Sequence, residues 1–489
     1  MPHEDSETMM TSQLSDHTHE LCAFLSQVKF EDIPVATIER TKDLVLDHVA
    51  VALLAANHPA TVTIRQVILA CDGGGESTIY GSQKKAGRAA AALINGAAAH
   101  GLSLDDLHSE SFSHPGAVII SAALATAEAL DASPRDFLTA VVVGYEAHGR
   151  AGAAANKALS RGFHPTAAAG VFGASAAVAS LLKLDCAGFE SAFGLALSNV
   201  SGVMQFAEDP EAAMKRLHAG WPAQNGLMAA QLAAAGVRGP HGALDGRFGF
   251  INVFAGSGDE TRLTRDMGNA WEIDQICIKL YACCRFFHSS IDALQHCKDE
   301  MKFSVEDVES IGVTASSVTL DSRMQYRPKS VTAAQYSLPF AMASTLLLDP
   351  KNPDSFSEHQ AARVDLIELM DKVTATVDPM LDSYLPERVP GKVRVTLKTG
   401  EFFEEFREDS MGTPGMPVDR DDITSKFRAL TLGIGDADWQ SSLSTEITEL
   451  DKKSSLSPLT LMLREDGSNH SSNGKKFSHT PVRQRTAPA

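Results

Sequence analysis

Two histidines and three carboxylates occur within the ten residues 105–114. Histidine titrates near neutral pH, so this segment carries groups that general acid–base catalysis uses. Ala-rich stretches at 89–99 and 118–129 flank it and predict buried helices, because Ala and Leu favour helix and Pro is absent. A polar loop between two buried helices must hydrogen-bond its charges or face a cavity. The alternative is a solvated turn with a helix cap near Ser113 and Pro115 at the first helical position.

Two further segments place titratable side chains beside predicted helices. His164 lies in a Gly-Phe-His-Pro break before a helix of small residues, where a structural or surface role is the alternative. Lys215, Arg216 and His218 lie within four positions of one another in an otherwise acidic chain. These cations suit an anionic ligand, and the alternative is a solvated basic helix face.

Lys279 and Tyr336 lie where the character of the chain changes. Lys279, in Ile-Lys-Leu-Tyr, follows the change in sequence near Trp271, and ligand pockets form preferentially at domain junctions. Tyr336 begins a predicted apolar helix over 336–348. The alternatives are an interfacial lysine with a buried stem and a buried tyrosine with a local hydrogen bond.

Composition restricts the partners of the chain. Its 489 residues carry a formal net charge of −18, which disfavours nucleic acid and anionic membrane surfaces. An anionic substrate is compatible with this charge only if its pocket concentrates Lys, Arg and His. The longest apolar runs, such as 171–182, are too short to span a bilayer, so we expect no membrane partner.

The cysteines and the N-terminus indicate the cellular compartment of the protein, and the cysteine spacing argues against a metal centre. Seven scattered cysteines contain no C-x-x-C pair, so we expect no zinc or iron–sulfur centre and a reducing environment. The first twenty residues carry five acids and no apolar core. This pattern fits neither a secretory signal nor a mitochondrial presequence, and we expect a cytoplasmic protein.

The periodicity of the chain predicts a mainly α protein with a smaller α+β region. We expect a disordered N-terminus over 1–17, a helical domain over 18–272, and an α+β domain over 273–410. Within the α+β domain we expect the end of an acidic helix at 305–309 and a strand over 311–314. We also expect a β-hairpin in which 391–397 pairs with 401–406 around the turn Thr399-Gly400. Residues 411–465 return to helix, and 466–489 read as a disordered tail.

Four motifs in order resemble one family. Asp-Asp-x-His with a following His-Pro, Gly-Phe-His-Pro-Thr, Met-Lys-Arg-Leu-His-Ala-Gly and Ile-Lys-Leu-Tyr-Ala-Cys-Cys are similar to motifs of the MmgE/PrpD family. The spacing of six from His108 to His114 and the Cys-Cys pair resemble fungal members. The resemblance implies a large helical domain formed by N- and C-terminal segments, with an inserted α+β lid. It also implies a homodimer without a metal or organic cofactor.

By that resemblance, the active site lies between the helical domain and the lid. His114, His164, Lys215 and Tyr336 are the expected catalytic residues. The expected substrate-binding residues are Asp105, Asp106, His108, Arg216, His218 and Lys279.

The family includes 2-methylcitrate dehydratases and cis-aconitate decarboxylases, so the resemblance implies a lyase acting on a di- or tricarboxylate. Dehydration of a 2-methylcitrate or 2-alkylcitrate is the first expectation. Decarboxylation of cis-aconitate to itaconate is the alternative, followed by epimerisation through the same carbanion. A catalytically inactive helical binding protein is the non-enzyme alternative, against which the full set of His, Lys and Tyr positions argues.

Overall fold

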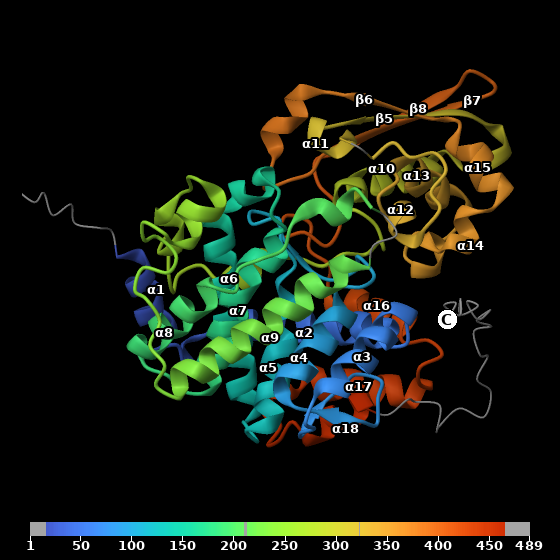
Figure 1. Cartoon of the computed structure of the whole chain (residues 1–489). Coiled ribbons are helices and arrows are strands. Elements are labelled where there is room, and N and C mark those ends of the chain that lie inside the picture. The colour runs from blue at the N-terminus through green and yellow to red at the C-terminus, as the bar shows by residue number, and fades with distance from the viewer. Residues whose placement is uncertain (1–15, 210–212, 322, 465–489) are drawn as a thin grey trace, which may run out of the picture.

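The structure is a computed structural model that describes residues 16–209, 213–321 and 323–464. The predicted disordered ends lie outside these residues, except that helix α1 already begins at His17. Figure 1 shows a large helical part and a smaller part that contains a sheet. The chain is therefore mainly α, as the periodicity predicts. Among the described residues, no helix is both long and apolar enough to cross a membrane.

The helical part contains twelve of the labelled helices. They are α1 (His17–Leu25), α2 (Val35–Ala55), α3 (Pro59–Cys71), α4 (Arg88–Ala99), α5 (Pro115–Ala129), α6 (Pro134–Ala154), α7 (Pro165–Leu181), α8 (Cys186–Leu197), α9 (Met214–Ala234), α16 (Arg420–Leu430), α17 (Ala437–Thr448) and α18 (Ser457–Arg464). Helices α5 and α7 are buried along almost their whole length, with α4, α6 and α9 packed around them. Helices α16 and α17 pack on α2, so the C-terminal segment returns to the helical part.

Small residues allow these central helices to approach closely. A Cβ atom on Gly220 of α9 would lie 2.6 Å from the backbone oxygen of Leu93 in α4, closer than atoms can pack. Helix α9 also continues through Pro222, although Pro usually interrupts a helix. Helix α9 begins at Met214, so the Met-Lys-Arg-Leu-His segment forms its first turn.

The smaller part contains a four-stranded sheet in the order β6-β5-β7-β8. Its helices are α10 (His288–Met301), α11 (Ser317–Leu320), α12 (Val331–Gln335), α13 (Leu338–Leu347), α14 (Glu358–Ala361) and α15 (Val364–Met370). Its strands are β5 (Val308–Ala315), β6 (Val373–Val377), β7 (Gly391–Leu397) and β8 (Phe402–Arg407). Strand β6 is parallel to β5, and the other pairs are antiparallel. Helices α10 and α13 lie between the sheet and the helical part (Figure 1).

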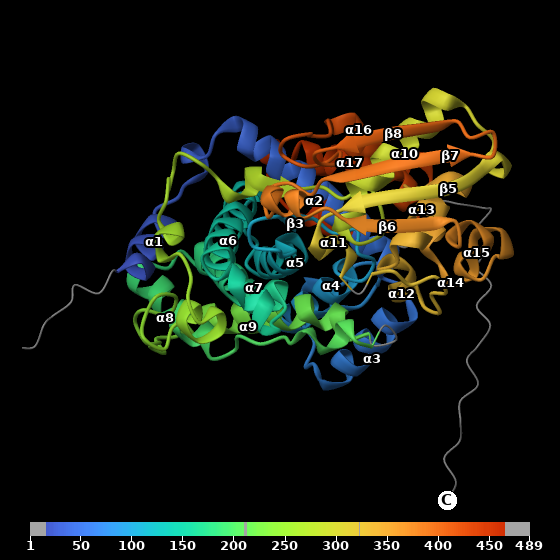
Figure 2. The same ribbon diagram turned by 90° about the horizontal axis from the view of Figure 1, so that it is seen from above.

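The predicted hairpin is confirmed by β7 and β8, which Figure 2 shows side by side. Two local predictions are wrong. The acidic segment near 305–309 is not the end of an α-helix, because α10 ends at Met301, Val305–Asp307 form a separate 3₁₀ turn, and β5 starts at Val308. The helix expected to begin at Tyr336 begins at Leu338, because the Ser337 hydroxyl accepts a hydrogen bond from the backbone N–H of Phe340 and caps it.

Two short strand pairs complete the fold. Strands β1 (Ser77–Thr78) and β2 (Lys85–Ala86) pair with each other within the helical part. Strand β3 (Leu107–His108) pairs with β4 (Ile276–Cys277), about 170 residues later in the chain. This second pair holds the acidic loop beside the segment that carries Lys279.

Candidate active site

His114 and His164 each precede a proline that begins a buried helix. Pro115 is the first residue of α5 and Pro165 the first residue of α7. Proline suits this position because its φ angle is helical and the first turn needs no donor from it. Helices α5 and α7 pack against each other, and the N–H of His114 donates to the Thr166 hydroxyl across 3.0 Å. Both histidines therefore lie where helix N-termini carry partial positive charge.

Two lysines meet at Ser103. Lys215, the second residue of α9, donates from Nζ to the Ser103 hydroxyl at 2.9 Å, and Nζ of Lys279 donates to the Ser103 carbonyl. The β3–β4 pairing places Lys279 here. Burial, followed by the charge of Lys215, lowers the pKa of Lys279 to about 8. A third helix N-terminus and two ammonium groups thus face the same region as the histidines.

These side chains line one cavity of about 130 Å³ between the helical part and the smaller part. Ser103, His114, His164 and Lys215 come from the helical part, and Tyr336 from the smaller one. The remaining wall contains two arginines, Arg285 and Arg323, and a set of apolar residues, namely Leu107, Phe112, Leu159, Met204, Phe206, Phe286, Pro386 and Val389. The Arg323 guanidinium lies 5.1 Å from the centre of the Phe286 ring. The cavity thus combines cationic and apolar side chains, and its size suits a small acid.

Four imidazole rings cluster behind and beside this cavity. Ring centroids are 5.0 Å apart for His100 and His114, 5.6 Å for His100 and His164, and 5.0 Å for His164 and His218. The Nδ1 atoms of His164 and His218 are 3.1 Å apart, so one donates a proton to the other. Burial lowers the pKa of His114 to about 3 and that of His218 to about 4, and lowers those of His100 and His164. The substrate-free cluster is therefore neutral at pH 7.

Asp105 is the carboxylate that contacts two of these imidazoles. Its Oδ2 atom lies 2.6 Å from Nδ1 of His100 and 3.4 Å from Nδ1 of His114. Burial raises the pKa of Asp105, but His114, His100 and the Lys215 ammonium outweigh burial and hold it well below the usual range. Asp105 is an ionised carboxylate that orients two imidazoles.

The proton on His114 can be assigned from its partners. Its Nδ1 lies 2.7 Å from the backbone oxygen of Asp106, and a carbonyl oxygen only accepts. Nδ1 therefore carries the proton, and Nε2 has the free lone pair. His100, Asp105 and His114 form a compact group of metal-type ligands, but a metal at Nδ1 of His114 would break this hydrogen bond. The geometry suits proton transfer better than metal binding.

Five of the six expected substrate contacts lie outside the wall of this cavity, and Asp105 is one of them. Asp106 accepts hydrogen bonds from the Gly116 N–H at 2.9 Å and the Tyr145 hydroxyl at 2.6 Å, and thereby fixes the start of α5. Its pKa is raised by burial to about 7. His218 lies behind His164. The structure therefore gives these two residues supporting positions.

His108 and Arg216 also lie outside the cavity wall. His108 is buried between Glu272 at 3.1 Å and the Ser111 hydroxyl at 2.8 Å. Arg216 donates to the Thr61 hydroxyl at 3.3 Å and lines a neighbouring hollow of about 320 Å³. Direct substrate contact by any of these five residues stays a prediction.

Tyr336 lines the cavity, but not from the position that the sequence predicts. It lies between α12 and α13 and not on the first turn of a helix, and it is half-buried. The Lys215 ammonium lies 5.8 Å from the centre of its ring. Tyr336 and Lys215 thus join the two parts of the protein across the cavity.

Sequence reasoning missed His100 and Ser103. His100 ends the Ala-rich helix α4, and a titratable residue at the end of an apolar helix was the available signal. Its Nε2 atom and Oδ1 of Asp105 are buried with no hydrogen-bond partner among the described residues. Ser103 gave no signal, because a loop serine is common without function. Cys284, from the Cys-Cys pair of the fourth motif, also lines the cavity.

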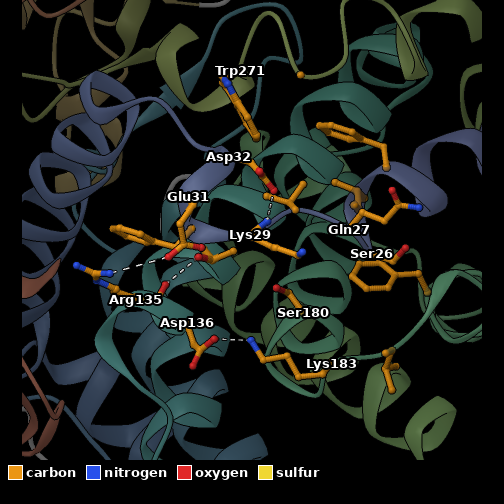
Figure 3. Close-up of a pocket in the computed structure, with 18 of the residues that line it drawn as sticks. Ser26, Gln27, Lys29, Glu31, Asp32, Arg135, Asp136, Ser180, Lys183 and Trp271 are labelled. Atoms are coloured by element: carbon orange, nitrogen blue, oxygen red, sulfur yellow. Dashed lines mark hydrogen bonds and ion pairs between the residues drawn. The ribbon is translucent and has the colours of Figure 1, made fainter.

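A larger hollow lies elsewhere, between the segment after α1 and helices α6 and α7 (Figure 3). Its volume is about 990 Å³, and four of its labelled charged side chains are paired, Arg135 with Glu31 and Lys183 with Asp136. No histidine lines it. It therefore offers little for binding a polyanion, and the smaller cavity is the better candidate site.

Comparison with known families now places the chain. The MmgE/PrpD N-terminal domain matches residues 19–262 and the MmgE/PrpD C-terminal domain matches residues 281–452. Because these matches cover most of the chain, the protein belongs to the MmgE/PrpD family, as its motifs suggest.

Relatives of the chain are named as cis-aconitate decarboxylases or as similar to them. The chain is 28% identical to a cis-aconitate decarboxylase of Aspergillus terreus over 484 residues, which cover 93% of this chain and 98% of the relative. It is 28% identical to a cis-aconitate decarboxylase-like protein of Aspergillus oryzae, covering 91% and 97%. The human cis-aconitate decarboxylase is 26% identical, covering 92% and 95%.

Proposed function

We propose that this protein is a lyase that decarboxylates cis-aconitate to itaconate and CO₂ without a metal or organic cofactor. The motifs favour dehydration of a 2-methylcitrate as the first expectation. The full-length relatives, named as cis-aconitate decarboxylases, favour the alternative. The observation that supports it is the cavity itself, where helix N-termini and two lysines meet apolar side chains.

The cationic side chains suit a substrate that keeps two carboxylates. The reaction breaks the bond between the methylene carbon and its carboxylate carbon, and that electron pair forms the terminal C=C of itaconate. The electrons of the original double bond take up one proton, and CO₂ leaves. Lys215 and Lys279 hold the two remaining carboxylates by charge-assisted hydrogen bonds, aided by the N-termini of α5 and α7.

The apolar side chains suit the carboxylate that departs. A carboxylate in apolar surroundings loses hydration, whereas the CO₂ that it becomes is neutral and needs none. Met204, Phe206 and Phe286 provide apolar surface within the same cavity. The cavity thus destabilises one carboxylate and stabilises the charge that spreads over the other two.

The histidines supply the proton. They are neutral in the free protein, and a bound polyanion raises their pKa values, so binding draws in a proton from solvent. The reaction consumes one proton per turnover. His114, with Nδ1 held by the Asp106 carbonyl, presents Nε2 as the carrier, and His164 lies beside the same cavity.

Dehydration of a 2-alkylcitrate is the second candidate. The same apolar wall offers space for an alkyl group, and a pair of histidines serves removal of the C–H proton and protonation of the departing hydroxyl. The homodimer and a cytoplasmic location remain expectations, and light scattering after gel filtration tests the dimer.

A comparison of turnover separates the two candidates. Purified protein is incubated with cis-aconitate and with 2-methylcitrate, and products are identified by proton NMR. The proposal expects kcat/KM for cis-aconitate to exceed that for 2-methylcitrate by at least about 100-fold, a difference of roughly 2.7 kcal/mol in transition-state stabilisation. A preference for 2-methylcitrate would reassign the reaction to dehydration.

A further inference from the structure

A second cluster of ligand-type side chains lies where α1 packs on α8, away from the cavity. Nδ1 of His19 lies 3.0 Å from Oε1 of Glu190, and Sγ of Cys186 lies 3.8 Å from the same nitrogen. Nδ1 of His241 lies 3.4 Å from Oε2 of Glu190. Figures 1 and 2 both show α1 and α8 side by side at one edge of the molecule.

The separations among three of these donors are close to those within a tetrahedral metal site. Zinc lies about 2.0–2.1 Å from imidazole nitrogen and about 2.3 Å from thiolate, which places neighbouring ligand atoms roughly 3.3–3.8 Å apart. The donor atoms of His19, Cys186 and Glu190 all lie within 4.8 Å of one another. His241 is outside this group, and its side chain, which is 80% exposed, must turn inward from Glu190 to supply a fourth ligand. With it, two nitrogens, one sulfur and one carboxylate form a donor set that favours zinc over magnesium or calcium.

The local structure presents these groups together. Cys186 is the first residue of α8 and Glu190 lies one turn later, so both point toward α1. His19 lies in the first turn of α1, and His241 lies in the loop after α9. The His19 side chain is 51% exposed and that of Glu190 only 10%, so an ion can enter from solvent onto a fixed carboxylate.

We propose that His19, Cys186, Glu190 and His241 form a zinc-binding site that fastens helix α1 to α8. The alternative is that His19 and Glu190 form a surface ion pair only, which does not require the Cys186 thiol beside them. The site is structural and separate from the cavity, so turnover of cis-aconitate does not depend on it.

Cobalt(II) tests the coordination directly, because a cobalt–thiolate bond gives a near-ultraviolet charge-transfer band. We expect full-length, EDTA-treated protein to bind one Co²⁺ with this band, and Zn²⁺ to displace it. Cys186→Ser should abolish the band, whereas Cys71→Ser, at an exposed cysteine on α3, should retain it. Binding without the band, or its equal loss in both variants, would overturn the proposal.

Two further measurements do not depend on the cysteine variant. Glu190→Gln and His241→Gln should each weaken Zn²⁺ binding at least about tenfold in calorimetry, since each removes one of four ligands. Hydrogen exchange of residues 17–25 should slow when Zn²⁺ is added to the wild-type protein. Unchanged exchange, or full affinity in both variants, would contradict a site that joins α1 to α8.

Discussion

Oδ2 of Asp105 lies 2.6 Å from Nδ1 of His100, and both groups are buried beside the cavity. The carboxylate orients His100 and His114 but also repels an anionic substrate. Asp105→Asn should therefore lower kcat about 10²-fold while a tricarboxylate inhibitor binds equally well or more tightly. Inhibitor affinity and kcat, measured on the same preparation, separate this role from a structural one, which would weaken both.

Its neighbour Asp106 provides the matched control. Asp106 contacts the start of α5 and lies outside the cavity wall. Asp106→Asn keeps an oxygen that accepts from the Gly116 N–H, so kcat should stay within about threefold of the wild-type value. The melting temperature should fall, because the carboxylate that accepts from the Tyr145 hydroxyl is replaced. A kcat loss as large as that of Asp105→Asn would place both carboxylates in the reaction.

His114 and His164 should be the proton-transfer pair. General acid–base groups contribute roughly 10²–10⁴-fold, so His114→Gln and His164→Gln should each lose at least about 10²-fold in kcat. Both variants should still bind a tricarboxylate inhibitor, because Lys215 and Lys279 remain. His296→Gln, at a partly exposed histidine of α10, is the control. Near-normal kcat in either variant would assign the proton to Tyr336, a lysine or water.

Lys215→Ala should raise KM and lower kcat without unfolding the protein. A charge-assisted hydrogen bond to a carboxylate is worth roughly 1.5–3 kcal/mol, so kcat/KM should fall about 10- to 100-fold. Lys84→Ala removes an exposed lysine and should change neither constant. Unchanged kinetics of Lys215→Ala, with a normal circular dichroism spectrum, would limit this buried lysine to its structural contact with Ser103.

The pH dependence of kcat/KM should report Lys279. Burial lowers its pKa to about 8, so the free protein has the ammonium below pH 8 and loses it above. We expect kcat/KM to fall above about pH 8. Lys279→Arg, which keeps its charge, should move that loss to higher pH if the guanidinium fits. A profile that is flat from pH 7 to 9.5 in the wild-type protein would contradict this role.

The sequence predicts most of the fold because strong periodicity decides it. Ala-rich helices and the alternating hairpin leave few alternatives, whereas β6 is mostly exposed and gives no apolar pattern. Gly220 and Pro222 weaken the local helix signal of α9, but Gly220 packs closely on α4 and Pro222 lies against Gly170 of α7. The sequence of one helix cannot show that packing against other helices accommodates a residue that disfavours helix.

The candidate site was predictable only in part. His114, His164, Lys215 and Lys279 occur in recognisable motifs, and the structure brings them to one cavity. His108 lies in the same motif as His114, but its side chain faces Glu272. Neighbouring residues of a strand point to opposite sides, so Leu107 faces the cavity and His108 faces away from it. His100 belongs to no motif and reaches the cluster only through the packing of α4 beside α5.

The central claim is tested most directly by following cis-aconitate in D₂O with EDTA-treated protein. The account predicts that NMR will show itaconate with one deuterium in the methylene group beside its carboxylate, and release of one CO₂ per turnover. Full activity should persist after chelation. Formation of a hydrated acid without CO₂, or activity that returns only when a metal is added, would contradict cofactor-free decarboxylation.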